Sequence, residues 1–426
     1  MSVKMKVIYN SKVKETLFVE KLKNGLTIMI LPKKNIQKKY IIWGTHYGSN
    51  DNKFIVPGEE EPIEVPKGVA HFLEHKMFEQ ENGINSLDKL TSIGVNANAY
   101  TTNDHTAYLY ECTENFYEAL DEFMDYVQHP YFTDENVEKE KGIIGQEIKM
   151  YDDYPEWRVY LNALSAMYYV NPIKLDITGT IQTISKIDKD ILYKCYNTFY
   201  NLSNMSLVIS GDFEPEKLIE EIKKRLIDKP QNGEIKRIFE EEPENIVKEK
   251  IEQKMTVSKP LFTIGIKCKV PKQNEKVRVH IGIEIILNLL IGESSSLFKQ
   301  LYNDGNVYSV PSISYEFGSN YAHILISESA NNPEKVYEKL KKQINEFIVN
   351  GIKEQDFNRI KKMLYGEYIK EYDDVTTIGR MLLSDYMKGI NSFDYIEEIE
   401  CIDLNYINQV LKDNFKEEKM VLSVVK

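Results

Sequence analysis

Two histidines and a glutamate lie close together in the segment His71-Phe-Leu-Glu-His75. On an α-helix, residues four positions apart lie one above the other on the same face, so His71 and His75 could bind one metal ion. Glu74 projects from nearly the same side, where a carboxylate can take a proton from a metal-bound water. A catalytic zinc site requires three protein ligands and one open position. The segment therefore supplies two ligands and a base, unless it is only a helix with two unrelated histidines.

A third ligand has to come from another element. Apolar periodicity and capping residues predict a second helix that begins at Thr133 or Asp134. This helix carries Glu140 and Glu147, which share a face because seven residues make two helical turns. Glu147 is the candidate third ligand, and Glu140 could accept the other ring N–H of a ligating histidine. A solvated glutamate is the alternative for Glu147, and periodicity alone leaves both open.

A strand that could hold a substrate is predicted between these two helices. Residues 96–102 are rich in small side chains, which suits a sheet edge that accepts an extended peptide. Asn98, Ala99 and Tyr100 are its candidate substrate-binding residues. An ordinary edge strand is the alternative reading. Residues 107–112 predict a neighbouring strand.

Further strands should build the rest of the first sheet. Asn24-Gly25 between two apolar runs predicts a hairpin within residues 16–32, and residues 39–46 predict another strand. Residues 49–67 are polar, contain several Pro and Gly residues, and predict an irregular loop.

The second half of the chain repeats the first. Gly145–Asp153 matches Gly366–Asp374 at an offset of 221 residues, and two further segments match at 220. The repeat predicts two homologous α+β domains, each an antiparallel sheet covered by helices. At offset 220 the zinc segment falls on Ile291–Ser295, which contains no histidine, and at offset 221 Glu147 falls on Tyr368. Only the first copy is therefore predicted to bind metal.

The domain boundary should lie in a polar stretch broken by Pro and Gly. We predict a zinc-binding domain over residues 1–228, a charged linker over 229–250, and a homologous non-metal domain over 251–426.

Composition restricts the partners and the location. The 426-residue chain has a formal net charge of −12, which argues against a nucleic-acid partner and against an anionic membrane surface. Four widely spaced cysteines predict free thiols rather than disulfides. We find no apolar run of signal-peptide or membrane-spanning length, so the expected location is the cytoplasm.

These motifs together resemble the pitrilysin/insulinase family of zinc metallopeptidases, the inverzincins, whose signature is H-x-x-E-H. The matching neighbourhoods are Gly68–Glu79 and Glu140–Tyr151, with Asn96–Tyr100 similar to the family's substrate strand. The resemblance is to the short bacterial two-domain type, akin to mitochondrial-processing-peptidase subunits. It implies that His71, His75 and Glu147 bind Zn²⁺, that Glu74 is the general base, and that the two domains face each other across a central chamber.

One segment departs from the family pattern. Active members usually carry an Arg and a Tyr in the second domain, and Ser294–Ser309 resembles that segment. Tyr308 matches the Tyr, but Tyr302 stands where the Arg is expected. A guanidinium adds charge stabilisation to a developing oxyanion that a phenol lacks. A homologous partner subunit could supply the Arg, Tyr308 could act with Lys299, or the register of the match could differ by a turn.

The sequence therefore predicts a zinc endopeptidase that cleaves peptides or unfolded segments held along residues 96–102. Glu74 is its general base and Tyr308 a further catalytic candidate. The alternatives are a subunit of a heterodimeric processing peptidase that is inactive without a homologous partner, a peptide-binding scaffold, and a non-proteolytic zinc hydrolase. Without such a heterodimer, a homodimer is expected.

Overall fold

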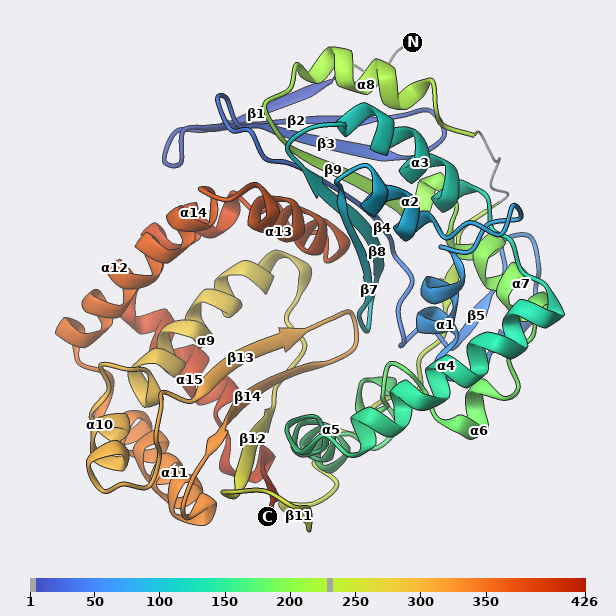
Figure 1. The fold of residues 1–426 in the computed structure, drawn as a ribbon. Coiled ribbons are helices and arrows are strands. Elements are labelled where there is room, and N and C mark those ends of the chain that lie inside the picture. The colour runs from blue at the N-terminus through green and yellow to red at the C-terminus, as the bar shows by residue number, and fades with distance from the viewer. Residues whose placement is uncertain (1–4, 228–232) are drawn as a thin grey trace. The chain divides into compact units, whose positions relative to one another are not determined.

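The computed structural model describes residues 5–227 and 233–426. The chain divides into two compact units, and each unit draws on both halves of the sequence (Figure 1). Unit 1 contains Met1–Ile148, Asp176–Ile238 and Lys370–Met387, and unit 2 contains Lys149–Leu175, Phe239–Ile369 and Lys388–Lys426. The boundary predicted at residues 228 and 229 lies outside the described residues, and the sequence-based domain limits stay predictions.

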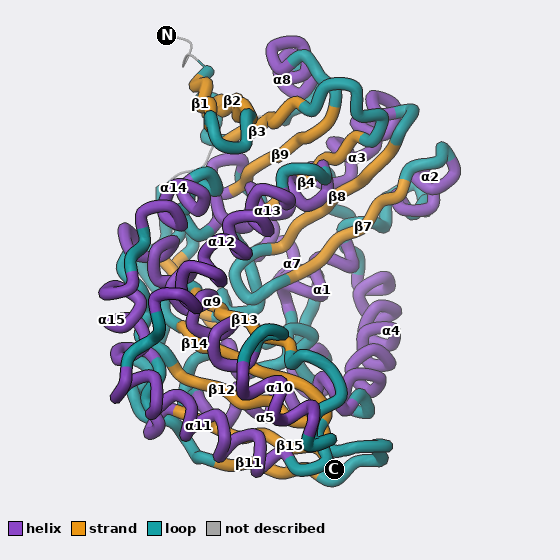
Figure 2. Tube along the Cα trace, turned by 90° about the vertical axis from the view of Figure 1, so that its left-hand side faces the viewer, coloured by secondary structure: helices purple, strands orange, loops and turns teal. Residues whose placement is uncertain are grey.

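Unit 1 is built on a seven-stranded sheet whose strands lie side by side in Figure 2. The predicted hairpin and the strands predicted at residues 39–46, 96–102 and 107–112 are all confirmed. The sheet is mixed rather than purely antiparallel, because β3 and β9 pair in parallel. In spatial order the strands are β1 (Lys6–Asn10), β2 (Glu15–Lys21), β3 (Thr27–Pro32), β9 (Met205–Gly211), β4 (Lys39–Thr45), β8 (Thr106–Cys112) and β7 (Asn96–Thr101).

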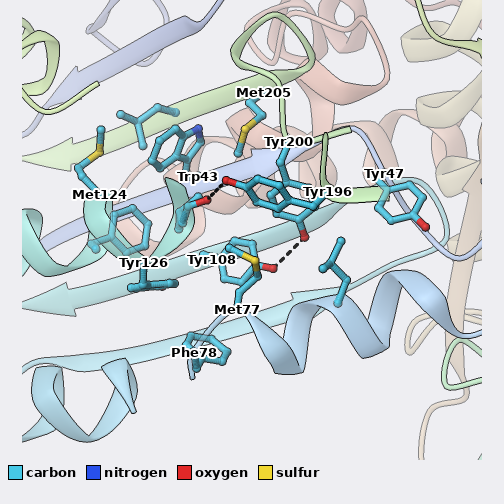
Figure 3. Close-up of a cluster of buried hydrophobic side chains, with 14 of the residues drawn as sticks. Trp43, Tyr47, Met77, Phe78, Tyr108, Met124, Tyr126, Tyr196, Tyr200 and Met205 are labelled. Atoms are coloured by element: carbon cyan, nitrogen blue, oxygen red, sulfur yellow. Dashed lines mark hydrogen bonds between the residues drawn. The ribbon is translucent and has the colours of Figure 1, made fainter. Parts of the chain in front are cut away.

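Helices cover the sheet of unit 1 and enclose an aromatic core. Figure 3 shows part of this core, where the hydroxyls of Tyr108 and Tyr200 lie 2.8 Å apart in a hydrogen bond. The helices are α1 (Val69–Lys76), α2 (Ser86–Ser92), α3 (Phe116–Gln128), α4 (Asp134–Asp152, which continues into unit 2), α6 (Ile181–Ile184), α7 (Lys189–Phe199), α8 (Pro215–Lys223) and α13 (Val375–Met387), with a 3₁₀ turn η2 (Leu202–Asn204).

The irregular loop predicted at residues 49–67 is wrong in part. It contains strands β5 (Lys53–Ile55) and β6 (Pro62–Glu64), which form a small sheet with β10 (Lys236–Arg237). Arg237 Nε donates a 2.9 Å hydrogen bond to the buried Asp51 carboxylate, and this ion pair fixes the small sheet. Residues 236 and 237 lie inside the predicted linker. This part of the linker is therefore a strand of the small sheet and not only a connection between domains.

Unit 2 repeats the arrangement with five strands. Their order matches that of β3, β9, β4, β8 and β7, and β11 and β15 repeat the single parallel pair. The repeated fold is thus confirmed, with mixed sheets in place of antiparallel ones. The strands, in spatial order, are β11 (Lys250–Gln253), β15 (Met420–Val425), β12 (Leu261–Lys267), β14 (Ala322–Ser329) and β13 (Ser312–Phe317).

The helices of unit 2 follow the same sequence of elements. One stretch, Gln273–Asn303, is long and apolar enough to span a membrane. However, 72% of its most apolar 18-residue segment is buried inside the structure, as expected for a helix of a protein core. The elements are α5 (Pro155–Met167), α9 (Lys276–Ile291), α10 (Ser296–Asn303), α11 (Pro333–Asn350), α12 (Glu354–Glu371), α14 (Asp394–Cys401), α15 (Leu404–Asn414), and the 3₁₀ turns η1 (Pro172–Lys174), η3 (Gln273–Glu275) and η4 (Glu417–Lys419).

The two halves of the sequence exchange one helix each. Helix α13, from the second half of the sequence, packs on β4 and β9, while α5, from the first half, packs on β12 and β15. A glycine allows each close approach: a Cβ on Gly44 would lie 2.8 Å from Leu383 of α13, and one on Gly265 would lie 2.8 Å from Met167 of α5. The helix exchange is therefore part of the repeat.

Candidate metal centre

Helix α1 carries the H-x-x-E-H segment and is held at both ends. At its start Gly68 has a φ of 94°, and a Cβ there would lie 2.5 Å from the carbonyl oxygen of Thr178. Beyond its end, Phe78 packs against the rings of Tyr108 and Tyr126, at centroid distances of 5.8 and 5.3 Å (Figure 3). Its apolar residues Val69, Phe72 and Leu73 are buried, so packing fixes the direction of the polar side chains.

The structure brings His71, His75 and Glu147 together. Glu147 Oε2 lies 3.7 Å from Nε2 of His71 and 3.6 Å from Nε2 of His75. One possible ligand atom from each of the three residues lies within 4.8 Å of those of the others. Two imidazoles from α1 and one carboxylate from α4 therefore converge on one point, as in a two-His, one-Glu zinc site.

The electrostatics of this cluster suit a cation. Glu147 Oε2 is buried and has no hydrogen-bond partner, which is costly for a carboxylate unless a cation or donor meets it. Burial, followed by the nearby His75, lowers the pKa of His71 to about 3, so its imidazole is neutral and its lone pair is available. The residues present therefore fit a divalent metal such as Zn²⁺.

Glu140 orients His75 from behind. Its Oε1 lies 3.1 Å from Nδ1 of His75, which leaves Nε2 facing Glu147. The fully buried Lys76 has its Nζ 3.7 Å from the other oxygen of Glu140. Burial alone would raise the pKa of Glu140, but the hydrogen bond from His75 and the charges of His75 and Lys76 bring it below its usual value. Glu140 is thus an ionised acceptor for the histidine.

Glu74 lies beside the cluster and is tied to the edge strand. Thr101 Oγ1, at the end of β7, donates a 2.6 Å hydrogen bond to Glu74 Oε2. Only 8% of Glu74 is exposed, and this burial raises the pKa of its carboxyl group despite the hydrogen bond from Thr101. A raised pKa suits a group that must both accept and return a proton near neutral pH.

The three candidate substrate residues occupy the edge strand. Strand β7 pairs with β8 on one side and lies at the end of the sheet order. Ala99 packs against the core, whereas Asn98 is exposed and its side chain accepts a 2.8 Å hydrogen bond from the Ala99 N–H. The ring of Tyr100 packs edge-on against His105, with 5.6 Å between centroids.

The second-half candidates lie in unit 2. Tyr308 is 40% exposed; its hydroxyl donates a 2.6 Å hydrogen bond to Oδ1 of Asn331, and Lys259 Nζ lies over its ring. Tyr302, at the position expected for the Arg, lies on α10 and is 54% exposed. The role of Tyr308 in catalysis stays a prediction.

Unit 2 contains a counterpart of the cluster that lacks the metal ligands. The 220-residue offset between the repeats does not lead to it. The segment Ile291–Ser295, predicted as the equivalent of the zinc segment, lies at and beyond the end of α9. Instead, α9 carries His280 and Glu284 four residues apart, with Nε2 of His280 3.6 Å from Oε1 of Glu284. Tyr368 of α12, the match to Glu147, donates a 2.5 Å hydrogen bond to Glu284. A phenol thus replaces the third ligand.

Sequence reasoning did not single out Thr101, Lys76 or His280. The alternation of β7 could have identified Thr101, because residues 97, 99 and 101 share the face that packs on the core. Lys76 had no such signal, since a lysine after a helical motif is usually solvated.

Comparisons with known proteins identify the family of the chain. The family model described as Insulinase (Peptidase family M16) matches residues 60–181, and the one described as Peptidase M16 inactive domain matches residues 186–364. A Bacillus subtilis (strain 168) protein described as an uncharacterized zinc protease, YmfH, is 35% identical over 428 residues, 99% of each chain. The crystal structure of an M16-like peptidase from Alicyclobacillus acidocaldarius matches with a TM-score of 0.92 and 30% identity, over 100% of this chain and 99% of that one.

A more distant relative is described as a peptidase subunit. A probable mitochondrial-processing peptidase subunit beta of Arabidopsis thaliana is 27% identical over 161 residues, which cover 37% of this chain and 30% of that protein.

Proposed function

The chain belongs to the insulinase family of peptidases, family M16, and on this premise we propose that it is a zinc-dependent endopeptidase acting on peptides or unfolded segments. The observation that carries the proposal is the convergence of His71, His75 and Glu147, with the unpartnered oxygen of Glu147 between the two imidazoles. These three residues would hold the zinc ion.

The chain's own residues would supply the proton chemistry. Zinc, when bound, lowers the pKa of a water at its open position toward neutrality. Glu74 would accept the proton from the attacking water and return it to the leaving amine. The hydrogen bond from Thr101 orients the Glu74 carboxylate, and Glu140 fixes the ring of His75.

The edge of β7 would hold the substrate as an added strand. Main-chain hydrogen bonds along Asn98, Ala99 and Tyr100 would provide affinity with little dependence on sequence. Because β7 ends at Thr101, a peptide bound there would pass close to Glu74.

A second candidate is a subunit that requires a homologous partner. Tyr302 at the position expected for an Arg supports this, as does the similarity to a mitochondrial-processing peptidase subunit. Such a partner would supply the missing Arg together with a Tyr. Without an Arg–Tyr partner, a homodimer is the remaining arrangement.

The purified full chain tests both candidates. We expect it to bind one zinc ion and to cleave a quenched fluorescent peptide, and we expect Glu74→Gln to retain the zinc and lose the cleavage. Normal turnover by Glu74→Gln would refute the mechanism. Zinc binding without cleavage, restored by adding a homologue that carries the Arg and Tyr, would identify the partner-dependent subunit.

A further inference from the structure

The two faces of β7 have different surroundings. Side chains alternate along a strand, so Ala97, Ala99 and Thr101 share one face while Asn96 and Tyr100 point to the other. The first face packs on the core of unit 1 and reaches Glu74. The second face points toward α13, the helix that the second half of the sequence contributes to unit 1.

Glu111 is the acidic residue on this second face, and both of its carboxylate oxygens already have partners. Oε1 of Glu111 accepts a 3.1 Å hydrogen bond from Asn96 Nδ2. Its Oε2 accepts a 3.1 Å hydrogen bond from Thr376 Oγ1 of α13 and lies 2.7 Å from Lys38 Nζ. Glu111 therefore has little capacity left for a cationic group of a ligand.

Arg380 of α13 also lies beside this second face of β7, and it differs from Glu111 in its partners. Its guanidinium carbon lies 5.4 Å from the centroid of the Tyr100 ring, and its side chain is exposed. It forms no ion pair with any carboxylate among residues 5–227 and 233–426, whereas Arg158, Arg225 and Arg237 do. A close approach of α13 to β4 sets its place, since a Cβ on Gly379 would lie 2.4 Å from the Tyr40 ring.

We propose that Arg380 binds a carboxylate of the peptide substrate and makes the enzyme prefer an acidic group beside the cleaved bond. This inference rests on the proposed peptidase function and adds a substrate class to it. A strand added to β7 runs about 4.8 Å away, and the side chain opposite Tyr100 has its Cβ about 5 Å from that of Tyr100. A carboxylate on that side chain can meet the guanidinium over the Tyr100 ring.

The chemistry of Arg380 favours this ligand over others. A guanidinium presents paired N–H donors that match the two oxygens of a carboxylate, and stacking on an aromatic ring restricts its orientation. Tyr100 and Thr101 are adjacent, so the bound acidic group lies within about two residues of the bond that faces Glu74. The carboxylate could belong to an Asp or Glu side chain or to the peptide's own C-terminus.

Binding to an inactive chain tests the proposal separately from catalysis. In the zinc-loaded full chain carrying Glu74→Gln, we would measure the affinity of labelled peptides that differ only by Glu or Gln at one position, scanned along the sequence. We expect a preference for Glu of about tenfold at one position. Adding Arg380→Gln should reduce the ratio to near one, and Arg380→Lys should retain part of it.

Arg359→Gln is the matched control, because Arg359 is an exposed helical arginine of unit 2 already paired with Asp356. It should leave the Glu/Gln ratio unchanged. Each peptide is used with a free and with an amidated C-terminus: a preference that follows the free terminus assigns the carboxylate to the chain end, and one that follows the internal Glu assigns it to the side chain. No preference at any position, or one that persists in Arg380→Gln, overturns the proposal.

Cleavage of the same peptides by the chain with Glu74 intact is measured in parallel. Peptide binding with an Arg380-dependent preference but no cleavage, even after a homologue that carries the Arg and Tyr is added, would refute the peptidase function and leave the carboxylate site standing. Cleavage without the preference would refute the carboxylate site and support the peptidase function.

Discussion

Thr101 Oγ1 donates a hydrogen bond of 2.6 Å to Oε2 of Glu74, so the outermost strand of the first sheet is joined directly to the candidate base. The same strand is the proposed platform for the substrate. Alignment of the base and alignment of the peptide therefore depend on one element, and a shift of β7 would disturb both together.

Thr101→Val should lower kcat while leaving KM and zinc content close to those of the unaltered chain. Valine keeps the shape of threonine but removes the donor, and a hydrogen bond to a charged group is worth enough to predict a loss of roughly tenfold. Steady-state kinetics on a quenched fluorescent peptide measures kcat and KM separately. Thr101→Ser, which keeps the hydroxyl, should recover most of the rate, and an unchanged kcat in Thr101→Val would contradict the positioning role.

Glu140→Gln should weaken zinc binding by about 10- to 100-fold, the usual effect of losing the group that orients a ligating histidine. Competition with a chelator of known affinity measures it. Glu138→Gln is the control, since this glutamate lies on the exposed side of the same helix and pairs with Lys141. Equal zinc affinities for the two variants would show that Glu140 does not support the site.

Gly68→Ala should destabilise unit 1 by about 1–3 kcal/mol, because an L-residue is strained at a φ of 94° and its Cβ would meet the Thr178 carbonyl. The midpoint temperature of thermal denaturation and the zinc content would both fall. Gly142→Ala, on α4 where a Cβ meets nothing within 4 Å, should be neutral or stabilising. If the two variants melted alike, the backbone contact would not hold α1.

Glu284→Gln should change how stability depends on pH. Burial raises the pKa of Glu284 to about 7 although Tyr368 opposes this, so the folded chain holds a proton that the unfolded chain releases above its ordinary value of 4.5. The stability that this proton contributes is complete below about pH 4.5 and is lost as the pH rises through 7. His280 acts in the other direction, because burial lowers its pKa to about 3 and stability is lost as the pH falls below 6.5.

The difference between the unaltered chain and Glu284→Gln isolates the glutamate. Urea unfolding between pH 5 and 8 should show the unaltered chain losing stability relative to the variant as the pH rises. Glu293→Gln, an exposed glutamate just beyond α9, should give no such slope. A difference that does not vary with pH would mean that Glu284 is ionised throughout.

Short-range features of this chain could be predicted from its sequence. The spacing of His71 and His75 is a local property of a helix, and the Asn24-Gly25 hairpin and the strand at Asn96 depend on nearby residues. The pairing of Glu147 with that helix required a family resemblance, since nothing local says which face of α4 meets α1.

Long-range features could not be obtained in this way. The constant offset failed at α9 because unit 1 inserts β5 and β6 between β4 and α1, whereas unit 2 passes from β12 to α9 through only a short connection. The contact between Arg380 and Tyr100 joins residues far apart in sequence, and no periodicity in either segment indicates it.

The exchange of α5 and α13 has a consequence for how the polypeptide is made. While the ribosome is still translating the second half, the face of the first sheet that Leu383 and its neighbours will cover stays open to solvent. Exposed apolar sheet in a nascent chain favours aggregation and recruits chaperones. A fragment that stops between the repeats would carry the metal ligands yet lack this cover, and adding the other fragment in trans should restore it. The first half of the sequence therefore needs the second half, on the same chain or added in trans, to cover this face of its sheet.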